Sequence, residues 1–106
     1  MIARNVTMHL KPNSVPAFTQ TLEKQIIPLL RKQKGFADEL TFIVPGGREA
    51  VGISLWERQE DADAYIRGGY PEVLKMLANV VEGTPQVQSL EVCNSTSHKI
   101  ASAIAA

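Results

Sequence analysis

The hydrophobic pattern of this chain changes its period in a fixed order, and this order constrains the fold more than any other feature. Residues 2 to 10 alternate between apolar and small or polar side chains, which indicates a β-strand. Apolar residues at spacings of three and four between 15 and 34 indicate one amphipathic helix. Two further strand-like runs, 36 to 44 and 48 to 56, flank Pro45-Gly46-Gly47, a signal for a hairpin turn.

The second half of the chain predicts a broken helix and a last strand. A helix is expected from about 60 to 67, Gly68-Gly69 interrupts it, and Pro71 opens another helix. Gly83-Thr84-Pro85 is interpreted as a turn, with a final strand at 86 to 93. The predicted order is therefore β-α-β-β-α-β, with the second helix in two pieces.

This order predicts an α+β fold, namely a ferredoxin-like plait. Short connections and right-handed crossovers give a four-stranded antiparallel sheet in the spatial order 4-1-3-2, with helices on one face. We take the first and third strands, neighbours in the centre, to run parallel. Pro28 lies inside the first helix, where it removes a backbone hydrogen bond, so we expect a kink or a locally bulged turn there. Gly35 is expected to end that helix.

Composition limits the partners of the protein. We divide the 106 residues into one domain, 1 to 94, and a C-terminal tail, 95 to 106, that is loose or packed on a partner subunit. Eleven basic residues balance eleven acidic ones, which argues against binding to nucleic acid or to an anionic membrane. No apolar stretch approaches the roughly 20 residues of a membrane span. A single cysteine and no secretory signal predict a cytoplasmic location.

Trp56, the only tryptophan, closes the apolar run that begins at Val51 and precedes an acid-rich helix start, 57 to 63. An amphipathic indole at a strand end lines either a core layer or the rim of a pocket. The sequence leaves both alternatives open.

A pocket follows from one assumption about the two central strands. Each strand has a bulky face and a small face, and the small faces carry Ala3, Asn5, Thr7 and His9 on one strand and Ala50, Gly52, Ser54 and Trp56 on the other. If both small faces lie under the helices, they leave a pocket lined by polar groups, and the bulky faces meet a second sheet across a dimer. Exchanging the faces would remove that pocket. Arg4 is the exception on the apolar side of its strand.

The element order, the strand-ending Trp56 before an acidic helix and the broken helix before the last strand resemble the antibiotic biosynthesis monooxygenase family over nearly all of residues 1 to 94. The resemblance implies a homodimeric α+β barrel that oxidises a small aromatic or quinol-type molecule with O₂ and without metal, flavin or other cofactor. Related members degrade haem through an asparagine on the first strand, a tryptophan after the third and a histidine in the next helix. Asn5 and Trp56 match by position, but residues 59 to 82 contain no histidine.

The candidate catalytic residues are Asn5, Trp56 and His9. The Asn5 amide and the Trp56 N–H are expected to donate hydrogen bonds to a phenolate or ketone, and His9 is a candidate base. Further side chains expected to contact the substrate are Thr7, Ser54, Tyr65 and Tyr70. No metal site or phosphate loop is predicted.

Whether the chain is an enzyme stays open at this stage. The alternatives are a dimeric-barrel module that binds a small molecule or acts in a stress response without turnover, haem handling through an unusual ligand such as His9, and a purely structural dimer. Oxygen consumption separates the first from an oxygenase, and a haem titration tests the second.

Overall fold

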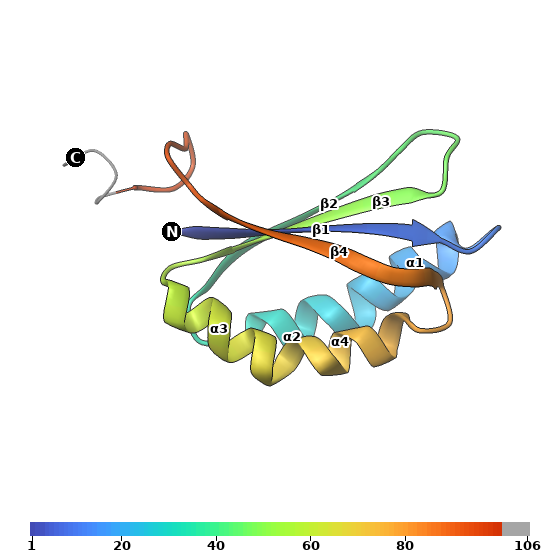
Figure 1. Ribbon diagram of the computed structural model, residues 1–106, viewed down its shortest axis with the longest axis horizontal. Helices are drawn as coiled ribbons and strands as arrows, with labels where there is room; N and C mark the ends of the chain where they lie inside the picture. The colour runs from blue at the N-terminus through green and yellow to red at the C-terminus, as the bar shows by residue number, and fades with distance from the viewer. Residues whose placement is uncertain (101–106) are drawn as a thin grey trace.

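A four-stranded sheet with helices on one face makes up the computed structural model, which describes residues 1–100 (Figure 1). The elements in chain order are β1 (Ile2–Leu10), α1 (Val15–Thr21), the π-helical turn η1 (Leu22–Ile26), α2 (Ile27–Arg31), β2 (Phe36–Ile43), β3 (Glu49–Trp56), α3 (Gln59–Arg67), α4 (Gly69–Leu77) and β4 (Val81–Glu91). This order confirms the predicted α+β plait and the helix broken at Gly68. No helix within residues 1–100 has both the length and the apolar character to cross a bilayer.

The strands lie in the order β2-β3-β1-β4, which is the predicted order counted from the opposite edge. β1 and β3 are antiparallel, so the expectation that they run parallel is wrong. The helical crossover returns β2 to the direction of β1, and the hairpin at residues 44 to 48 then reverses the chain for β3. All three strand pairs are therefore antiparallel.

β4 begins at Val81, five residues earlier than the sequence predicts. Gly83-Thr84-Pro85 is part of this strand and not a turn, and the pairing with β1 changes register beside it. Gly83 has a φ of 69°, a conformation that glycine adopts without strain. An edge strand tolerates a proline at such an irregularity because its missing N–H removes no bond between inner strands.

The first helical segment contains the bulged turn expected near Pro28. In η1 the Ile27 N–H donates to the carbonyl of Leu22, five residues back, instead of the usual four. Pro28 follows within α2 and has no N–H of its own to donate. The helix ends at Arg31, earlier than the end at Gly35 that the sequence predicts, and Gly35, with a φ of 77°, redirects the chain after it.

The pairing of the central strands shows which side chains share a face. Residues directly opposite each other in neighbouring strands point to the same side of a sheet. The face towards the helices carries the paired residues Arg4 and Ser54, Val6 and Gly52, and Met8 and Ala50. The other face carries Ala3 opposite Leu55, Asn5 opposite Ile53, and Thr7 opposite Val51. The assumption that the two small faces share a side is therefore wrong, because the bulky face of β1 lies beside the small face of β3.

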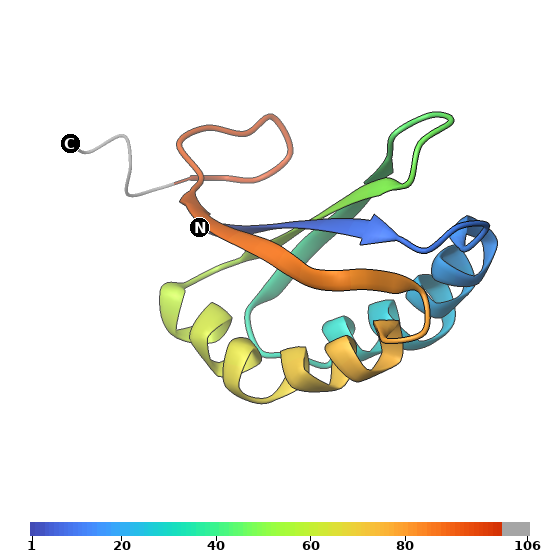
Figure 2. The same ribbon diagram turned by 45° about the vertical axis from the view of Figure 1, so that its right-hand side comes forward.

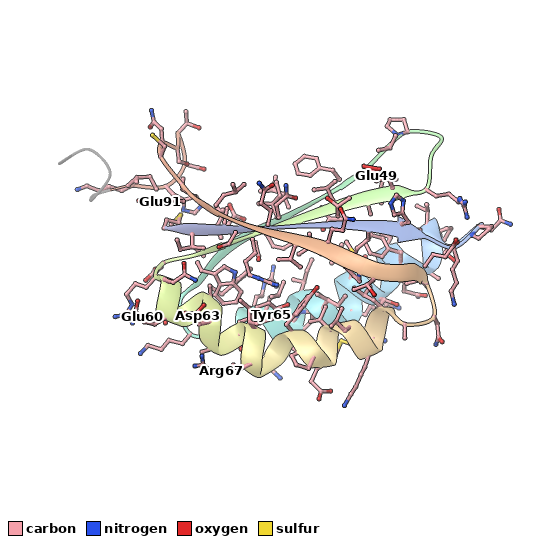
Figure 3. The ribbon with its side chains drawn as sticks, in the orientation of Figure 1. Glu49, Glu60, Asp63, Tyr65, Arg67 and Glu91 are labelled. Carbon is pink, nitrogen blue, oxygen red and sulfur yellow. The ribbon has the colours of Figure 1, made fainter. Side chains whose placement is uncertain are left out.

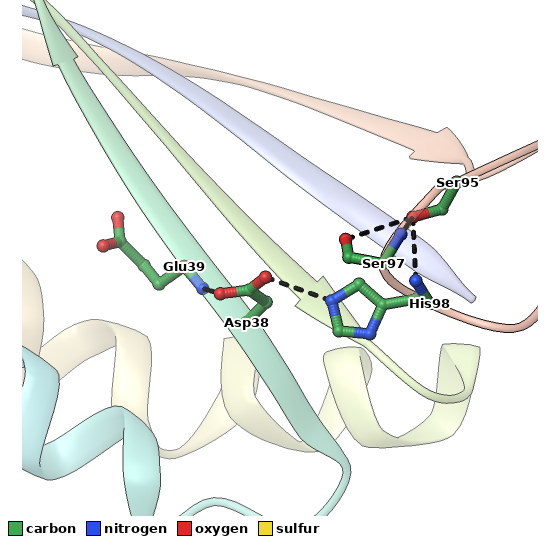
Figure 4. Close-up of polar contacts among 5 residues, drawn as sticks. All are labelled: Asp38, Glu39, Ser95, Ser97 and His98. Atoms are coloured by element: carbon green, nitrogen blue, oxygen red, sulfur yellow. Dashed lines mark hydrogen bonds and ion pairs between the residues drawn. The ribbon is translucent and has the colours of Figure 1, made fainter.

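The face of the sheet opposite the helices, which carries Ala3, Asn5 and Thr7, is called the uncovered face. The segment after β4 folds back over it (Figure 2). Asp38, opposite Leu55 on that face, pairs with His98, with 3.0 Å between Oδ2 and Nε2 (Figure 4). Ser95 Oγ accepts hydrogen bonds from the backbone N–H groups of Ser97 and His98. Ile100 is buried. The described part of the predicted tail thus contacts its own chain, while 101 to 106 lie outside the described residues.

Candidate functional site

A cavity lies between the sheet and the helices. Its lining residues are Arg4, Val6 and Met8 from β1, Glu39 and Thr41 from β2, Gly52 and Ser54 from β3, Phe18, Leu22, Ile26, Leu30, Tyr65, Tyr70, Val73 and Leu77 from the helical segments, and Pro85 from β4. Its volume, about 60 Å³, is room for a few water molecules, since one water needs roughly 10–15 Å³ of such space. An aromatic ligand therefore fits only if lining side chains move apart, and a single ring requires the least movement.

Aromatic side chains form one end of this cavity. Tyr65 stacks on Trp56 with 4.7 Å between the ring centroids and 24° between the planes, and Tyr70 lies 5.9 Å from Tyr65. Figure 3 shows Tyr65 between α3 and the sheet, whereas Arg67 lies on the outward side of that helix. Gly69 permits this arrangement, because a Cβ there would lie 2.8 Å from the Tyr65 ring. The cavity thus has a flat aromatic wall supported from behind.

Trp56 supports this wall and does not line the cavity itself. The indole is fully buried, and its N–H donates to Ser54 Oγ over 2.9 Å. Phe36 packs edge-on against its other side, 5.6 Å between centroids. Of the two alternatives raised by the sequence, Trp56 is therefore the core residue, and it lies directly behind the pocket wall instead of lining the rim.

Arg4 supplies a buried positive charge beside the aromatic wall. The residue is 3% exposed, and its guanidinium carbon lies 4.4 Å from the Tyr70 ring centroid and 5.5 Å from that of Tyr65. Its Nε has no hydrogen-bond partner, and within residues 1–100 no carboxylate lies within ion-pair distance of it. The rings compensate part of the charge by cation–π contact. The guanidinium therefore keeps donors free for an anionic oxygen.

Glu39 and Thr41 place an acidic group on the same face. The Thr41 hydroxyl donates to Glu39 Oε2 over 2.6 Å. Burial raises the pKa of Glu39, and the hydrogen bond from Thr41 offsets part of that rise. Glu39 is opposite Ser54 and Ser54 is opposite Arg4, so the acid and the cation lie in one row across three strands with a small residue between them.

Tyr65 remains protonated throughout the physiological range. Burial raises the pKa of its hydroxyl to about 12, although the charge of Arg4 acts in the opposite direction. A neutral phenol both donates and accepts a hydrogen bond. Tyr65 is thus suited to contact an oxygen of a bound ligand and not to act as a base.

The structure gathers only part of the predicted site. Ser54, Tyr65 and Tyr70 line the cavity, and Trp56 lies behind it. The pairing of β1 with β3 places Asn5, Thr7 and His9 on the uncovered face, away from the cavity. The Asn5 Oδ1 atom is shielded there and has no hydrogen-bond partner in the described part of the chain, whereas His9 is exposed.

Sequence reasoning missed Arg4, Glu39 and Thr41 as site residues. Arg4 had a signal, because a charged residue interrupts the apolar side of an otherwise regular strand. Glu39 and Thr41 had none, because polar residues that alternate with Leu40 and Phe42 are usual on the solvent side of a strand. Among residues 1–100 no group of His, Cys, Asp and Glu side chains is arranged to hold a metal ion.

Comparisons with known proteins identify the fold. No family model matches the sequence, and no curated protein matches it closely. Solved structures do: a protein of unknown function from Nitrosomonas europaea has a TM-score of 0.76 at 17% identity, over 90% of this chain and 91% of that one. A protein assigned to the antibiotic biosynthesis monooxygenases from Bordetella bronchiseptica gives 0.73 at 16% identity, over 86% and 95%. SnoaB, a cofactor-independent oxygenase from Streptomyces nogalater, gives 0.72 at 11% identity, over 92% and 97%.

These similarities define the class of structure to which the chain conforms. It has the fold of the antibiotic biosynthesis monooxygenases, as the sequence resemblance implies. At these identities the comparison concerns the fold alone, so the activity has to be argued from the site.

Proposed function

We propose that the protein is a small cofactor-independent oxygenase that oxidises a phenolic or quinol-type molecule with O₂ in the cavity beneath the helices. The observation that carries this proposal is the cavity itself, apolar on most sides and closed at one end by Tyr65 and Tyr70, with Trp56 stacked behind Tyr65. Oxygenation without a cofactor requires an electron-rich substrate that loses a proton and then passes an electron to O₂. A dry, preorganised site favours this step by holding the anion and stabilising its charge.

In this proposal the residues that line the cavity have different roles. Tyr65 and Tyr70 contact the face and edge of a bound ring, and Ser54, whose hydroxyl accepts from Trp56, still has its O–H to donate to a ligand oxygen. Trp56 holds Tyr65 in place from behind. In this proposal Asn5, Thr7 and His9 have no contact with the substrate, because they lie on the opposite face of the sheet.

Haem is a poor fit to the cavity. Its volume of about 60 Å³ is far below that of a porphyrin, and neither histidine of the chain lines it. His9 lies on the uncovered face and His98 pairs with Asp38. The residues present therefore offer no histidine ligand to an iron bound there.

The proposal includes a homodimer formed through the uncovered face of the sheet. Leu40, Phe42 and Leu90 are 48%, 51% and 43% exposed on this face, and Val51, Ile53 and Leu55 lie between them. Water around a contiguous apolar surface is displaced favourably by a matching surface. A second copy of the chain provides that surface by two-fold symmetry.

Oxygen uptake is the test of the activity. The protein, freed of metal by chelation, is mixed with a panel of hydroquinones, naphthoquinols and anthrones in an oxygen electrode, with Tyr65→Phe and Tyr70→Leu as cavity variants. We expect uptake above the spontaneous rate for single-ring or small fused substrates, reduced at least tenfold in Tyr70→Leu. Saturable quenching of Trp56 fluorescence without oxygen uptake would assign the protein to non-catalytic binding instead.

A further inference from the structure

A line of polar residues crosses the sheet directly under the helices, and the proposed oxidation does not by itself require it. Glu39 on β2, Ser54 on β3 and Arg4 on β1 are successive partners in the two ladders. Neighbouring strands are about 4.8 Å apart, so the acid and the cation start from backbone positions roughly 10 Å apart. Their charged groups do not meet within ion-pair distance. A carboxyl group and a guanidinium cation thus face one cavity from two sides without pairing with each other.

The state of Arg4 indicates what this gap receives. A buried charge is unfavourable unless it is paired or hydrogen-bonded, and among residues 1–100 the guanidinium contacts ring faces while its Nε has no hydrogen-bond partner. Arginine binds planar anions through several N–H groups at once. Ser54 lies between the two charged residues and is small, so the gap between them can receive such a group. Gly52 also lines the cavity and adds no side chain. A ligand with an anionic oxygen completes the hydrogen bonding of Arg4.

We propose that the cavity is selective for charge, and that its ligand is a planar one-ring monoanion whose anionic oxygen binds Arg4 while a hydroxyl group on the opposite side donates to Glu39. The substrate class is therefore the hydroxylated aromatic monoanion, either a phenolate or a carboxylate. This assignment names the substrate class of the proposed function. It depends on the proposed oxygenase activity only for the conversion of the ligand and not for its binding. Binding tests the charge selectivity separately.

Binding of a matched pair of probes tests the role of Arg4. Benzoate and benzamide have nearly the same shape, and only benzoate is charged. Each is titrated at millimolar concentrations against the protein by calorimetry and by Trp56 fluorescence. We expect benzoate to bind at least tenfold more tightly in the native chain, with the preference lost in Arg4→Met and partly kept in Arg4→Lys. Arg67→Met, which removes an exposed arginine on the outward side of α3, is the control and should keep the preference.

A spectroscopic probe separates the phenolate from the carboxylate and does not depend on a variant that folds. 4-Nitrophenol absorbs differently when ionised, so binding beside Arg4 should raise its ionised fraction at a pH where it is mostly neutral in solution. A phenolate site gives this absorbance change together with benzoate binding, whereas a carboxylate site binds benzoate alone. Either result supports the proposal, and equal affinities for benzoate and benzamide would overturn it.

The hydroxyl contact with Glu39 has its own measurement. 4-Hydroxybenzoate should bind more tightly than benzoate in the native chain, by a factor of about 3 to 10, and this gain should disappear in Glu39→Ala, with Glu23→Ala on the first helical segment as control. An unchanged gain in Glu39→Ala would refute the contact. Charge-selective binding without oxygen uptake would leave this inference intact and remove only the proposed oxygenase activity.

Discussion

The two faces of the sheet are built from the same strands but differ in how their side chains are packed. Towards the helices, bulky residues of β1 lie beside small residues of β3, so the layer is incompletely filled and encloses Arg4 in a cavity. On the other side, small and polar residues such as Asn5 and Thr7 lie beside the large apolar side chains of β3, with those of β2 one strand further on, and no helix within residues 1–100 covers them. The comparison teaches that each face is incompletely packed in a different way: a cavity remains under the helices, and large apolar side chains stay exposed on the other side.

The largest expected effect comes from comparing one phenylalanine on each face. Phe18 is 1% exposed and lines the cavity. Phe18→Ala should lower the free energy of unfolding by about 3–5 kcal/mol, because removal of a buried ring leaves a hole. Phe42, 51% exposed, should cost less than about 1 kcal/mol in the monomer. Urea denaturation of both variants at low protein concentration measures the difference. Equal losses would show that the uncovered face is packed as tightly as the covered one.

A second comparison uses two neighbouring glycines at the junction of α3 and α4. Gly69→Ala places a methyl group 2.8 Å from the Tyr65 ring and 3.2 Å from Leu29, so we expect a loss of about 1–3 kcal/mol through overpacking. Gly68→Ala meets only the carbonyl of Ala64, at 3.4 Å, and should be close to neutral. Thermal unfolding gives the stabilities, and Trp56 emission reports whether the stacked ring has moved. A neutral Gly69→Ala would mean that the aromatic wall adapts.

A charged substitution on the uncovered face tests whether that face forms the dimer interface. Leu40→Lys should weaken self-association at least tenfold, about 1.4 kcal/mol, because a lysine ammonium resists burial in an apolar interface. Leu74→Lys, on the exposed side of α4, is the control for a helix-side leucine of similar exposure. Light scattering over a range of concentrations measures both. A mass near the monomer's 11.6 kDa for the native chain would remove the dimer altogether.

The smallest effects are expected from two adjacent carboxylates that point to opposite faces. Burial raises the pKa of Glu39, so the native state is most favoured below the ordinary pKa of that carboxyl and loses stability as the pH rises through the raised value. Glu39→Gln should therefore be slightly more stable than the native chain at pH 7, and the difference should shrink in acid. Melting temperatures between pH 3 and pH 8 check this.

Asp38 should show the opposite sign. The hydrogen bond with His98 lowers the pKa of Asp38, so the aspartate contributes stability above its ordinary pKa and loses it as the pH falls through the lowered value. Solvent screens this contribution, since the side chain is 41% exposed. Asp38→Asn should be slightly less stable at pH 7 and equal to the native chain in strong acid. Parallel pH profiles for the two variants would contradict the opposite directions of the two pKa shifts.

Much of the fold follows from the sequence because the periods of its pattern are local properties. The strand at residues 2 to 10, the hairpin at Pro45-Gly46-Gly47 and the distorted turn near Pro28 are each specified by residues within a few positions of one another. The start of β4 was missed because Gly83 and Pro85 favour turns in isolation, and only pairing with β1 makes them part of an edge strand.

The site was harder to predict because it depends on how strands align with each other. The pattern of β1 shows that Asn5 and Arg4 point to opposite sides, but not which side meets the small residues of β3. That choice is made by the antiparallel register, in which Arg4 comes opposite Ser54. An arginine that interrupts an apolar face, next to a small residue in a neighbouring strand, is the combination that points to the cavity.

The π-helical turn has a consequence for how the roof of the cavity is aligned. Four of its lining residues, Phe18, Leu22, Ile26 and Leu30, are spaced four apart, and in an ordinary α-helix each such step drifts by about 40° around the axis, so the row would spiral by about 120°. The extra residue accommodated in Leu22–Ile26 takes back about 100° of that drift. The π-helical turn thus acts as a phase correction: a regular α-helix over the same residues would turn Ile26 and Leu30 about 100° away from the cavity, although every side chain of the row stays in the sequence.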